Sequence, residues 1–202
     1  MPIKPITTVE ELEALYGEPH PLALKKVAHR ITPAYRRFIE ASRFLILSTV
    51  GPEGTDASPR GDDGPVAHIA NPETILIPDW KGNNRTDSLR NIVRDGRVSL
   101  MFMINGSDIV VRANGKAIVT ADSDLTGLFE QKGKHPRAVI VFTIEDLYYQ
   151  CAKALIRSGL WQRMDDAVGV PTAGQFLEEQ SADFDGTKWD REYPAYAKPN
   201  LW

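Results

Sequence analysis

The sequence predicts a mainly β protein of the α+β class, an antiparallel barrel of six strands with helices at both ends of the chain. Six segments between residues 43 and 144 are rich in apolar and β-branched residues, as strands are. Short connections join them, and only two helical insertions interrupt them, which favours antiparallel pairing over a parallel sheet. With 202 residues the chain is expected to form one domain, with helices over 1–42, the barrel over 43–150, and helices and a tail over 151–202.

Local signals place each element. Thr8 and Glu11 have the spacing of a capping box, Gly17 is expected to end this first helix, and Thr32 followed by Pro33 starts a second helix. Asn114-Gly115 is expected to bend or bulge the fifth strand. The six expected strands are residues 43–50, 55–60, 74–78, 97–104, 109–120 and 137–144, and the helical insertions are residues 87–95 and 122–131.

Composition excludes several classes of protein. The 24 Lys and Arg and 27 Asp and Glu give a net charge of −3, which argues against a general nucleic-acid surface. No apolar run approaches the roughly 18 residues that span a bilayer, and the acidic N-terminal segment is unlike a signal peptide. Cys151 is the only cysteine, and the four histidines lack metal-ligand spacing. We therefore expect a cytoplasmic protein without a membrane partner, a nucleic-acid partner or a metal site.

The densest polar cluster, residues 81–88 (KGNNRTDS), follows an expected strand and opens an expected helix. The N–H groups and dipole of a helix N-terminus favour an anion, and Arg85 adds a planar donor fork suited to phosphate. Thr86 and Ser88 add hydroxyl donors. The alternative is that Thr86 or Asp87 caps the helix and Arg85 is solvated. The cluster alone leaves both interpretations open.

Two further features have the same ambiguity. Arg60 ends an expected strand beside glycines and prolines, so it is either held against a ligand or part of a surface turn. Lys153, Arg157 and Trp161 follow one another at four-residue spacing, which places them on one face of an expected helix. Like charges at this spacing repel, so the face either binds an anion or is a solvated stripe. His68 is either a ligand contact or a structural histidine, and Cys151 is either a reactive thiol or a buried, inert one.

The order of these motifs resembles one known family. The sequence contains RFLILSTV, SPRGDDG, TILIPDW, GNNRTDSLRNI and RVSLMFMI in that order, and CAKALIRSGLW follows. This order is similar to that of the pyridoxamine 5'-phosphate oxidase-like flavoproteins, and within them to a bacterial branch of FMN-dependent enzymes. The resemblance covers about residues 40–165 and implies an FMN-binding split β-barrel with flanking helices.

The resemblance also implies a site. Members of the family bind FMN at the interface of a homodimer, and the phosphate, the flavin ring and the closing helix each have expected contacts here. The residues that match are Arg60, beside the flavin and its phosphate; Ile77, Pro78 and Asp79, whose backbone borders the ring; and Asn84, Arg85, Ser88 and Leu89, at the phosphate clamp. From their charges and spacing, we expect the face of Lys153, Arg157 and Trp161 to close over this site from the partner subunit.

The implied function is an FMN-dependent oxidoreductase that transfers hydride through flavin N5 to or from an unknown small molecule, with NADH or NADPH as candidate electron donors. No catalytic residue is assigned, because the redox chemistry belongs to the cofactor. The alternatives are a flavin-binding or storage protein without turnover, and a haem- or F420-binding relative on the same barrel.

Three departures from the oxidases point away from vitamin B6 as the substrate. Asp87-Ser88 stands where the oxidases have an arginine–lysine pair, and Val110 stands where they have a glutamine that contacts the flavin. The arginine-containing substrate motif near their C-terminus also has no match in DREYPAYAKPNLW.

Overall fold

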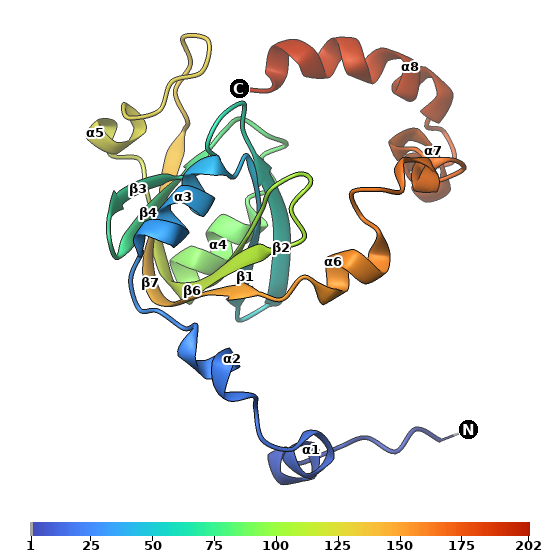
Figure 1. Cartoon of the computed structure of the whole chain (residues 1–202). Helices are drawn as coiled ribbons and strands as arrows, with labels where there is room; N and C mark the ends of the chain where they lie inside the picture. The colour runs from blue at the N-terminus through green and yellow to red at the C-terminus, as the bar shows by residue number, and fades with distance from the viewer. Residues whose placement is uncertain (1) are drawn as a thin grey trace.

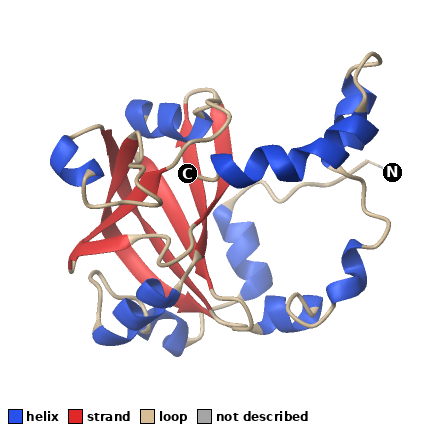
Figure 2. Cartoon of the chain, turned by 90° about the horizontal axis from the view of Figure 1, so that it is seen from above, coloured by secondary structure: helices blue, strands red, loops and turns tan. Residues whose placement is uncertain are grey.

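A computed structural model describes residues 2–202 and shows one open antiparallel sheet with helices around it (Figures 1 and 2). The strand order across the sheet is β2-β1-β5-β6-β7-β4-β3. The α+β class and the antiparallel pairing are confirmed, but the sheet has seven strands where six were expected. The strands are β1 (Phe44–Gly51), β2 (Gly54–Gly61), β3 (His68–Asn71), β4 (Thr74–Asp79), β5 (Arg97–Met103), β6 (Val110–Thr120) and β7 (Ala138–Gln150).

The additional strand, β3, is a four-residue edge strand that pairs only with β4. Its sequence, HIAN, carries only one large apolar residue, Ile69, so it lacks the β-rich signal of the other strands. A turn joins it to β4, in which the Asn71 side chain accepts a hydrogen bond from the Glu73 N–H at 2.9 Å.

The helical insertion expected over residues 122–131 is wrong in length, because α5 covers only Ser123–Thr126. The Thr126 hydroxyl donates back to the Asp122 carbonyl at 3.1 Å, and Gly127 follows as the C-cap. The insertion expected over residues 87–95 is confirmed as α4 (Asp87–Arg94).

The expected irregularity in the fifth strand is also present. The register between β6 and β7 shifts between Asn114 and Gly115, as a β-bulge does. At Gly115 a Cβ atom would collide with the Thr143 carbonyl oxygen of β7. Glycine is therefore required here by the close approach of the neighbouring backbone.

The hydrophobic core lies on the inner face of the curved sheet. Phe102 of β5 and Phe142 of β7 are fully buried, and Ile39 and Ile92 extend the core into two helices. These helices are α3 (Pro33–Ala41) and α4. The first turn of α3 begins as expected with Thr32 at the N-cap and Pro33 at the first helical position, although the Thr32 side chain makes no capping hydrogen bond.

The remaining long helices extend from the sheet in two arms. The N-terminal arm, residues 2–26, contains α1 (Val9–Tyr16) and α2 (Pro21–Lys25). The C-terminal arm, residues 151–197, contains α6 (Lys153–Ser158), a short 3-10 helix (Met164–Ala167), α7 (Ala173–Gln180) and α8 (Gly186–Ala197). Figure 1 shows α1 and α2 leading away from the sheet, whereas the chain after α8 returns to it.

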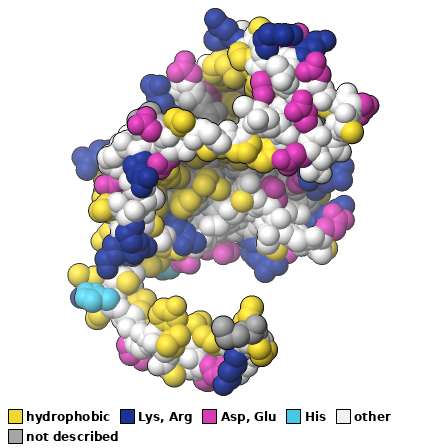
Figure 3. Space-filling view, turned by 90° about the vertical axis from the view of Figure 1, so that its right-hand side faces the viewer, with side chains coloured by type: hydrophobic (Ala, Val, Ile, Leu, Met, Phe, Trp, Pro, Cys, Tyr) yellow, Lys and Arg dark blue, Asp and Glu magenta, His cyan; other side chains and the backbone are white. Residues whose placement is uncertain are grey.

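In the space-filling view of Figure 3, hydrophobic side chains gather along the N-terminal arm, at the bottom of the view, and in a hollow of the body above it. Within residues 2–202, no helix has the length and apolar character needed to cross a bilayer.

Candidate functional site

An open cleft of about 930 Å³ lies between β2, the end of β4, the loop over residues 80–86 and the start of α4. This volume lies within the range of about 300–1,000 Å³ that small-molecule sites occupy. Seven of the expected site residues line the cleft: Arg60, Pro78, Asp79, Asn84, Arg85, Ser88 and Leu89. Ile77, another expected site residue, is next to Pro78 in the chain, but its side chain is fully buried in the core.

One wall of the cleft comes from β2. The side chains of Asp56, Ser58 and Arg60 are half-buried while those between them are exposed, because alternate residues of a strand face the same way. Arg60 Nη1 forms an ion pair with Asp79 Oδ1, which joins this wall to the end of β4. Both side chains are about one-fifth exposed, and Arg60 Nε is buried without a hydrogen-bond partner among the described residues. Arg60 therefore keeps one unsatisfied donor beside the cleft.

The opposite wall is the start of α4. Its N-cap residue, Thr86, makes no side-chain capping hydrogen bond, so the first N–H groups of the helix have no side-chain cap. Arg85 is exposed, and its Nε lies 2.5 Å from Asp87 Oδ2. The hydroxyl of Ser88, a buried residue, donates to Asp56 across the cleft. The helix N-terminus and an exposed guanidinium group thus border the same space.

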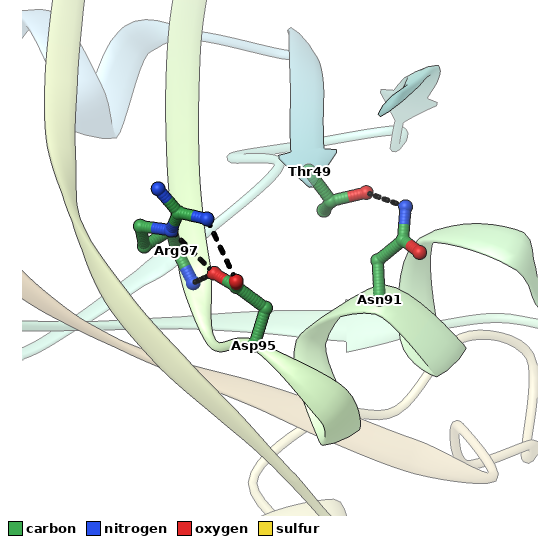
Figure 4. Close-up of polar contacts among 4 residues, drawn as sticks. All are labelled: Thr49, Asn91, Asp95 and Arg97. Atoms are coloured by element: carbon green, nitrogen blue, oxygen red, sulfur yellow. Dashed lines mark hydrogen bonds and ion pairs between the residues drawn. The ribbon is translucent and has the colours of Figure 1, made fainter. Parts of the chain in front are cut away.

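The far end of α4 is fixed to the sheet. Asn91 Nδ2 donates to Thr49 Oγ1 of β1 at 3.1 Å (Figure 4). The Asn91 side chain also packs so closely on Gly51 that a Cβ atom there would overlap it. These contacts hold the helix at the orientation that points its N-terminus into the cleft.

The turn after α4 is closed by Asp95 and Arg97. Arg97 Nε and Nη2 donate to the two Asp95 carboxylate oxygens at 2.6 and 2.8 Å (Figure 4). These hydrogen bonds lower the pKa of Asp95 from its usual 3.8 to about 2. The pair therefore stays charged at every pH above about 4, and it weakens only as the pH falls toward 2.

Two cations of the cleft were not among the expected site residues. Arg137 Nη1 donates to Asn84 Oδ1 at 2.9 Å, and Lys81 Nζ donates to Asn200 Oδ1 at 2.7 Å. Both have neutral partners here, and no ion pair joins either to a carboxylate of residues 2–202. The antiparallel pairing of Asp79 with Ala138 places Arg137 at this end of β4, so strand register was the signal that could have found it.

A family model described as pyridoxamine 5'-phosphate oxidase matches residues 31–151, which is more than half of the chain. The chain belongs to this family. The match includes every strand and the whole of β2, β4 and α4, which build the cleft. It begins after the N-terminal arm and ends at residue 151, where the C-terminal arm starts.

The chain is similar to several solved structures, of which the first described here supports the fold. A variant form of HupZ from Group A Streptococcus is 15% identical, with a TM-score of 0.50, over 59% of this chain and 99% of its own. An FMN-binding protein from Syntrophomonas wolfei is 14% identical, with a TM-score of 0.43, over 71% of this chain and 97% of its own. A Lactobacillus delbrueckii protein described as a putative pyridoxamine 5'-phosphate oxidase is 21% identical, with a TM-score of 0.48, over 60% and 95%. A search of curated proteins found no match.

Outside the family match, Lys153 and Arg157 lie in α6 as expected, but the expectation that Trp161 shares their helical face is wrong. Helix α6 ends at Ser158 because Gly159 takes the left-handed conformation with φ of 60°. Trp161 lies beyond that stop, and its Nε1 donates to the Ser107 carbonyl at 2.8 Å. None of the three residues lines the cleft of its own chain. Their contact with a cofactor of the partner subunit stays a prediction.

Two other candidates also lie outside the cleft. His68 is exposed and meets the Phe129 ring edge-on, with ring centroids 6.3 Å apart. Cys151 is exposed directly after β7. Among the described residues, no group of three His, Cys, Asp or Glu side chains is arranged to hold a metal ion.

The end of the chain, from Tyr193 of α8 to Trp202, forms a third wall, which the sequence did not predict. Tyr193 and Leu201 line the cleft, and Trp202 Nε1 donates to Asp62 Oδ1 at 3.1 Å. The half-buried Asp62 carboxylate also accepts from Trp80 Nε1 at 2.7 Å and from Gln131 Nε2 at 2.9 Å. One carboxylate therefore joins three segments that are far apart in the chain at the rim of the cleft.

Replacement of Asp62 tests this junction. We expect Asp62→Ala to lower the free energy of unfolding by about 1–3 kcal/mol, because it leaves three half-buried N–H donors without their acceptor. Urea unfolding of the purified variant measures the change. The control is Asp63→Ala, since Asp63 is exposed and pairs only with the exposed Arg43 at 3.5 Å. Equal effects of the two substitutions would show that Asp62 does not organise the rim.

Proposed function

We propose that the protein is an FMN-dependent oxidoreductase whose cofactor binds in the cleft between β2, β4 and the N-terminus of α4. The observation that carries the proposal is the convergence of seven expected site residues on one cavity of about 930 Å³. Family membership supports a flavin rather than another ligand. The proposal does not include pyridoxamine 5'-phosphate as substrate, because the sequence departs from the oxidases at Asp87-Ser88 and Val110.

The residues present fit the phosphate of FMN. A phosphate dianion is favoured by helix N–H groups without a side-chain cap and by guanidinium groups that can reach it. Arg85 is exposed beside Asp87, and Arg137 has only the neutral Asn84 as partner. We therefore assign the phosphate to Arg85, Arg137 and the first turn of α4, with Ser88 able to turn its hydroxyl from Asp56 to the ligand.

The residues also fit the ring system. Pro78 is a buried apolar residue of β4 that borders the cleft, and the Arg60–Asp79 pair lies directly beside it. The partnerless Arg60 Nε is a donor that a carbonyl or nitrogen of a flat ring could satisfy, in keeping with the rule that buried polar groups find partners. The Asp79 carboxylate neutralises the charge of Arg60, which makes Arg60 a poorer partner for a phosphate dianion. We therefore assign Arg60 to the end of the cleft that holds the ring rather than to the end that holds the phosphate.

When bound, FMN supplies hydride chemistry at its N5 atom. The chain's own residues would bind and orient it: Arg85 and Arg137 fix the phosphate, and the Arg60–Asp79 pair fixes the position of the ring wall. The segment of Tyr193 and Leu201 would limit the entry of water from the third side.

One experiment distinguishes an FMN-dependent oxidoreductase from a protein that only binds or stores flavin. The protein is loaded with FMN, and NADH or NADPH is added without oxygen while the flavin absorbance is followed. An oxidoreductase bleaches the flavin bands with at least one donor, whereas a storage protein keeps them with both and is reduced only by dithionite. The haem alternative gains no support from the cleft, because no histidine is among the residues that line it.

A further inference from the structure

A second cavity adjoins the cleft. We call it the side pocket: it has a volume of about 240 Å³ and is lined by Lys81, Lys134, His135, Arg137 and Trp202. Lys81 and Arg137 also line the cleft, so the two cavities share a wall. Three of the five lining residues are cations at neutral pH, and none is acidic. The side pocket is therefore a positively charged space beside the candidate cofactor site.

No carboxylate balances the cations of the side pocket. Among residues 2–202, no ion pair joins Lys81, Lys134 or Arg137 to an acidic side chain. Lys134 Nζ donates to the carbonyls of Pro199 and Trp202 at 3.0 and 2.7 Å, while Lys81 and Arg137 donate to side-chain amides. Three neighbouring cations with neutral partners only create a positive potential that attracts an anion, in a chain whose net charge is −3.

These cations keep hydrogen-bond donors for a ligand. An ammonium group has three N–H donors, of which Lys81 uses one and Lys134 uses two within residues 2–202. The guanidinium group of Arg137 has five, of which only one donates to a described residue. Arg137, on the shared wall, therefore has enough donors to serve both an anion in the side pocket and the FMN phosphate in the cleft.

A tight turn presents the lysines of the segment between β6 and β7. Gln131 and Lys134 exchange two backbone hydrogen bonds at 2.9 and 3.0 Å, and Lys132 and Gly133 between them have φ of 54° and 76°. This is the backbone of a two-residue hairpin turn, whose first position favours asparagine, aspartate or glycine. Lys132 occupies that position, and its Nζ lies 4.4 Å from the centroid of the Trp202 ring. The indole is thus held beside the lysines as a flat wall of the side pocket.

Cations beside a flat indole favour an oxyanion carried on a ring. Phosphate and carboxylate oxygens accept charge-assisted hydrogen bonds from ammonium and guanidinium groups, and the face of an indole packs on another flat ring. The volume of 240 Å³ is below the range of about 300–1,000 Å³ that small-molecule sites occupy. The side pocket therefore has room for an acidic group and its attachment, and the rest of the ligand would reach into the cleft across the shared wall.

We propose that the side pocket binds the phosphate or carboxylate group of the small molecule that reacts with the flavin, and that Lys81 and Lys134 determine the specificity for this anion. The role of the molecule as the reaction partner of FMN rests on the proposed function, whereas the binding of an oxyanion in the side pocket does not require FMN. Two sources of the same chemistry are the extra phosphate of NADPH, which NADH lacks, and the carboxylate of an organic acid.

The test measures the binding of four probes by isothermal titration calorimetry, first to the full chain without flavin and then to the chain saturated with FMN. Adenosine 2'-phosphate and benzoate each carry an oxyanion on a ring, and adenosine and benzamide are their uncharged counterparts. We expect at least one of the two anions to bind about tenfold or more tightly than its counterpart, both with and without FMN. The affinity for this anion should fall as the salt concentration rises.

Replacement of the two lysines locates the bound anion. The double variant of Lys81→Gln and Lys134→Gln removes both charges but keeps a side-chain N–H donor at each position, and it should weaken the binding of the anion by about tenfold or more. The matched control is Lys25→Gln with Lys188→Gln, because both of these lysines are exposed and neither lines the cleft or the side pocket.

The two sources of the anion give different results, and either result supports the proposal. Tighter binding of adenosine 2'-phosphate, with bound FMN reduced faster by NADPH than by NADH in the parent but not in the lysine variant, assigns the side pocket to the electron donor. Tighter binding of benzoate assigns it to an organic acid. Anions that bind no more tightly than their uncharged counterparts, that FMN displaces, or that the lysine variant binds as the parent does, would overturn the proposal. A protein that binds an anion at these lysines but does not bind FMN would overturn the proposed function and leave the side pocket intact.

Discussion

Arg85→Ala is expected to weaken FMN binding by about ten- to a hundredfold and riboflavin binding far less. The guanidinium group is exposed at the start of α4, where it can turn from Asp87 to a bound phosphate. A charge-assisted hydrogen bond contributes roughly 1.5–3 kcal/mol, which corresponds to this range of affinity. Riboflavin has the same ring but no phosphate, so it loses little when the phosphate contact is removed. Titration of the protein with each flavin, followed by flavin fluorescence, gives both constants.

The same measurement on Arg137→Ala should give a similar loss for FMN, because Arg137 lies beside Asn84 at the same end of the cleft. The control is Arg163→Ala, since Arg163 pairs with Asp166 on the C-terminal arm and does not line the cleft. If Arg85→Ala weakened FMN and riboflavin equally, Arg85 would not contact the phosphate, and the assignment of this end of the cleft would be wrong.

Phe142→Ala is expected to lower the free energy of unfolding by about 3–5 kcal/mol. Phe142 is fully buried in β7 and is paired in register with Ala117 of β6 and Ile75 of β4. Its removal therefore opens a cavity at the centre of the core, where the surrounding strands cannot collapse to fill it.

Phe44→Ala in β1 is the matched control, because Phe44 is 40% exposed and its loss should cost much less. Denaturant unfolding of the two variants measures the difference. A small effect of Phe142→Ala, similar to that of Phe44→Ala, would contradict the position of the core on this face of the sheet.

The strands that the sequence predicted are those whose apolar residues dominate locally. The segments before residue 144 give this signal, but β7 continues to Gln150 through the polar pair Glu145 and Asp146. Its last part pairs with Val110–Asn114 of β6, and on the other side Ala28 exchanges two backbone hydrogen bonds with Leu147, at 2.8 and 2.7 Å. A pairing across more than a hundred residues leaves no local pattern, so the extension of this strand could not be predicted.

The candidate site shows the same division. Arg60 and Arg85 were expected because each sits in a local motif of strand end or helix start. Arg137 and Trp202 were not, because their partners Asn84 and Asp62 are far away in sequence. The prediction that Trp161 shares a helical face with Lys153 and Arg157 was wrong for a different reason. It continued the four-residue spacing past Gly159, which ends α6.

The central claim is that the cleft between β2, β4 and α4 binds FMN, and the visible spectrum of the purified protein after incubation with excess FMN and removal of free ligand tests it most directly. The account predicts the two flavin bands in the near-ultraviolet and blue, at one FMN per chain, and their loss in a double variant of Arg85→Ala and Arg137→Ala. A protein that keeps no flavin, that shows an intense Soret band of haem instead, or whose double variant retains FMN as the parent does, would contradict it.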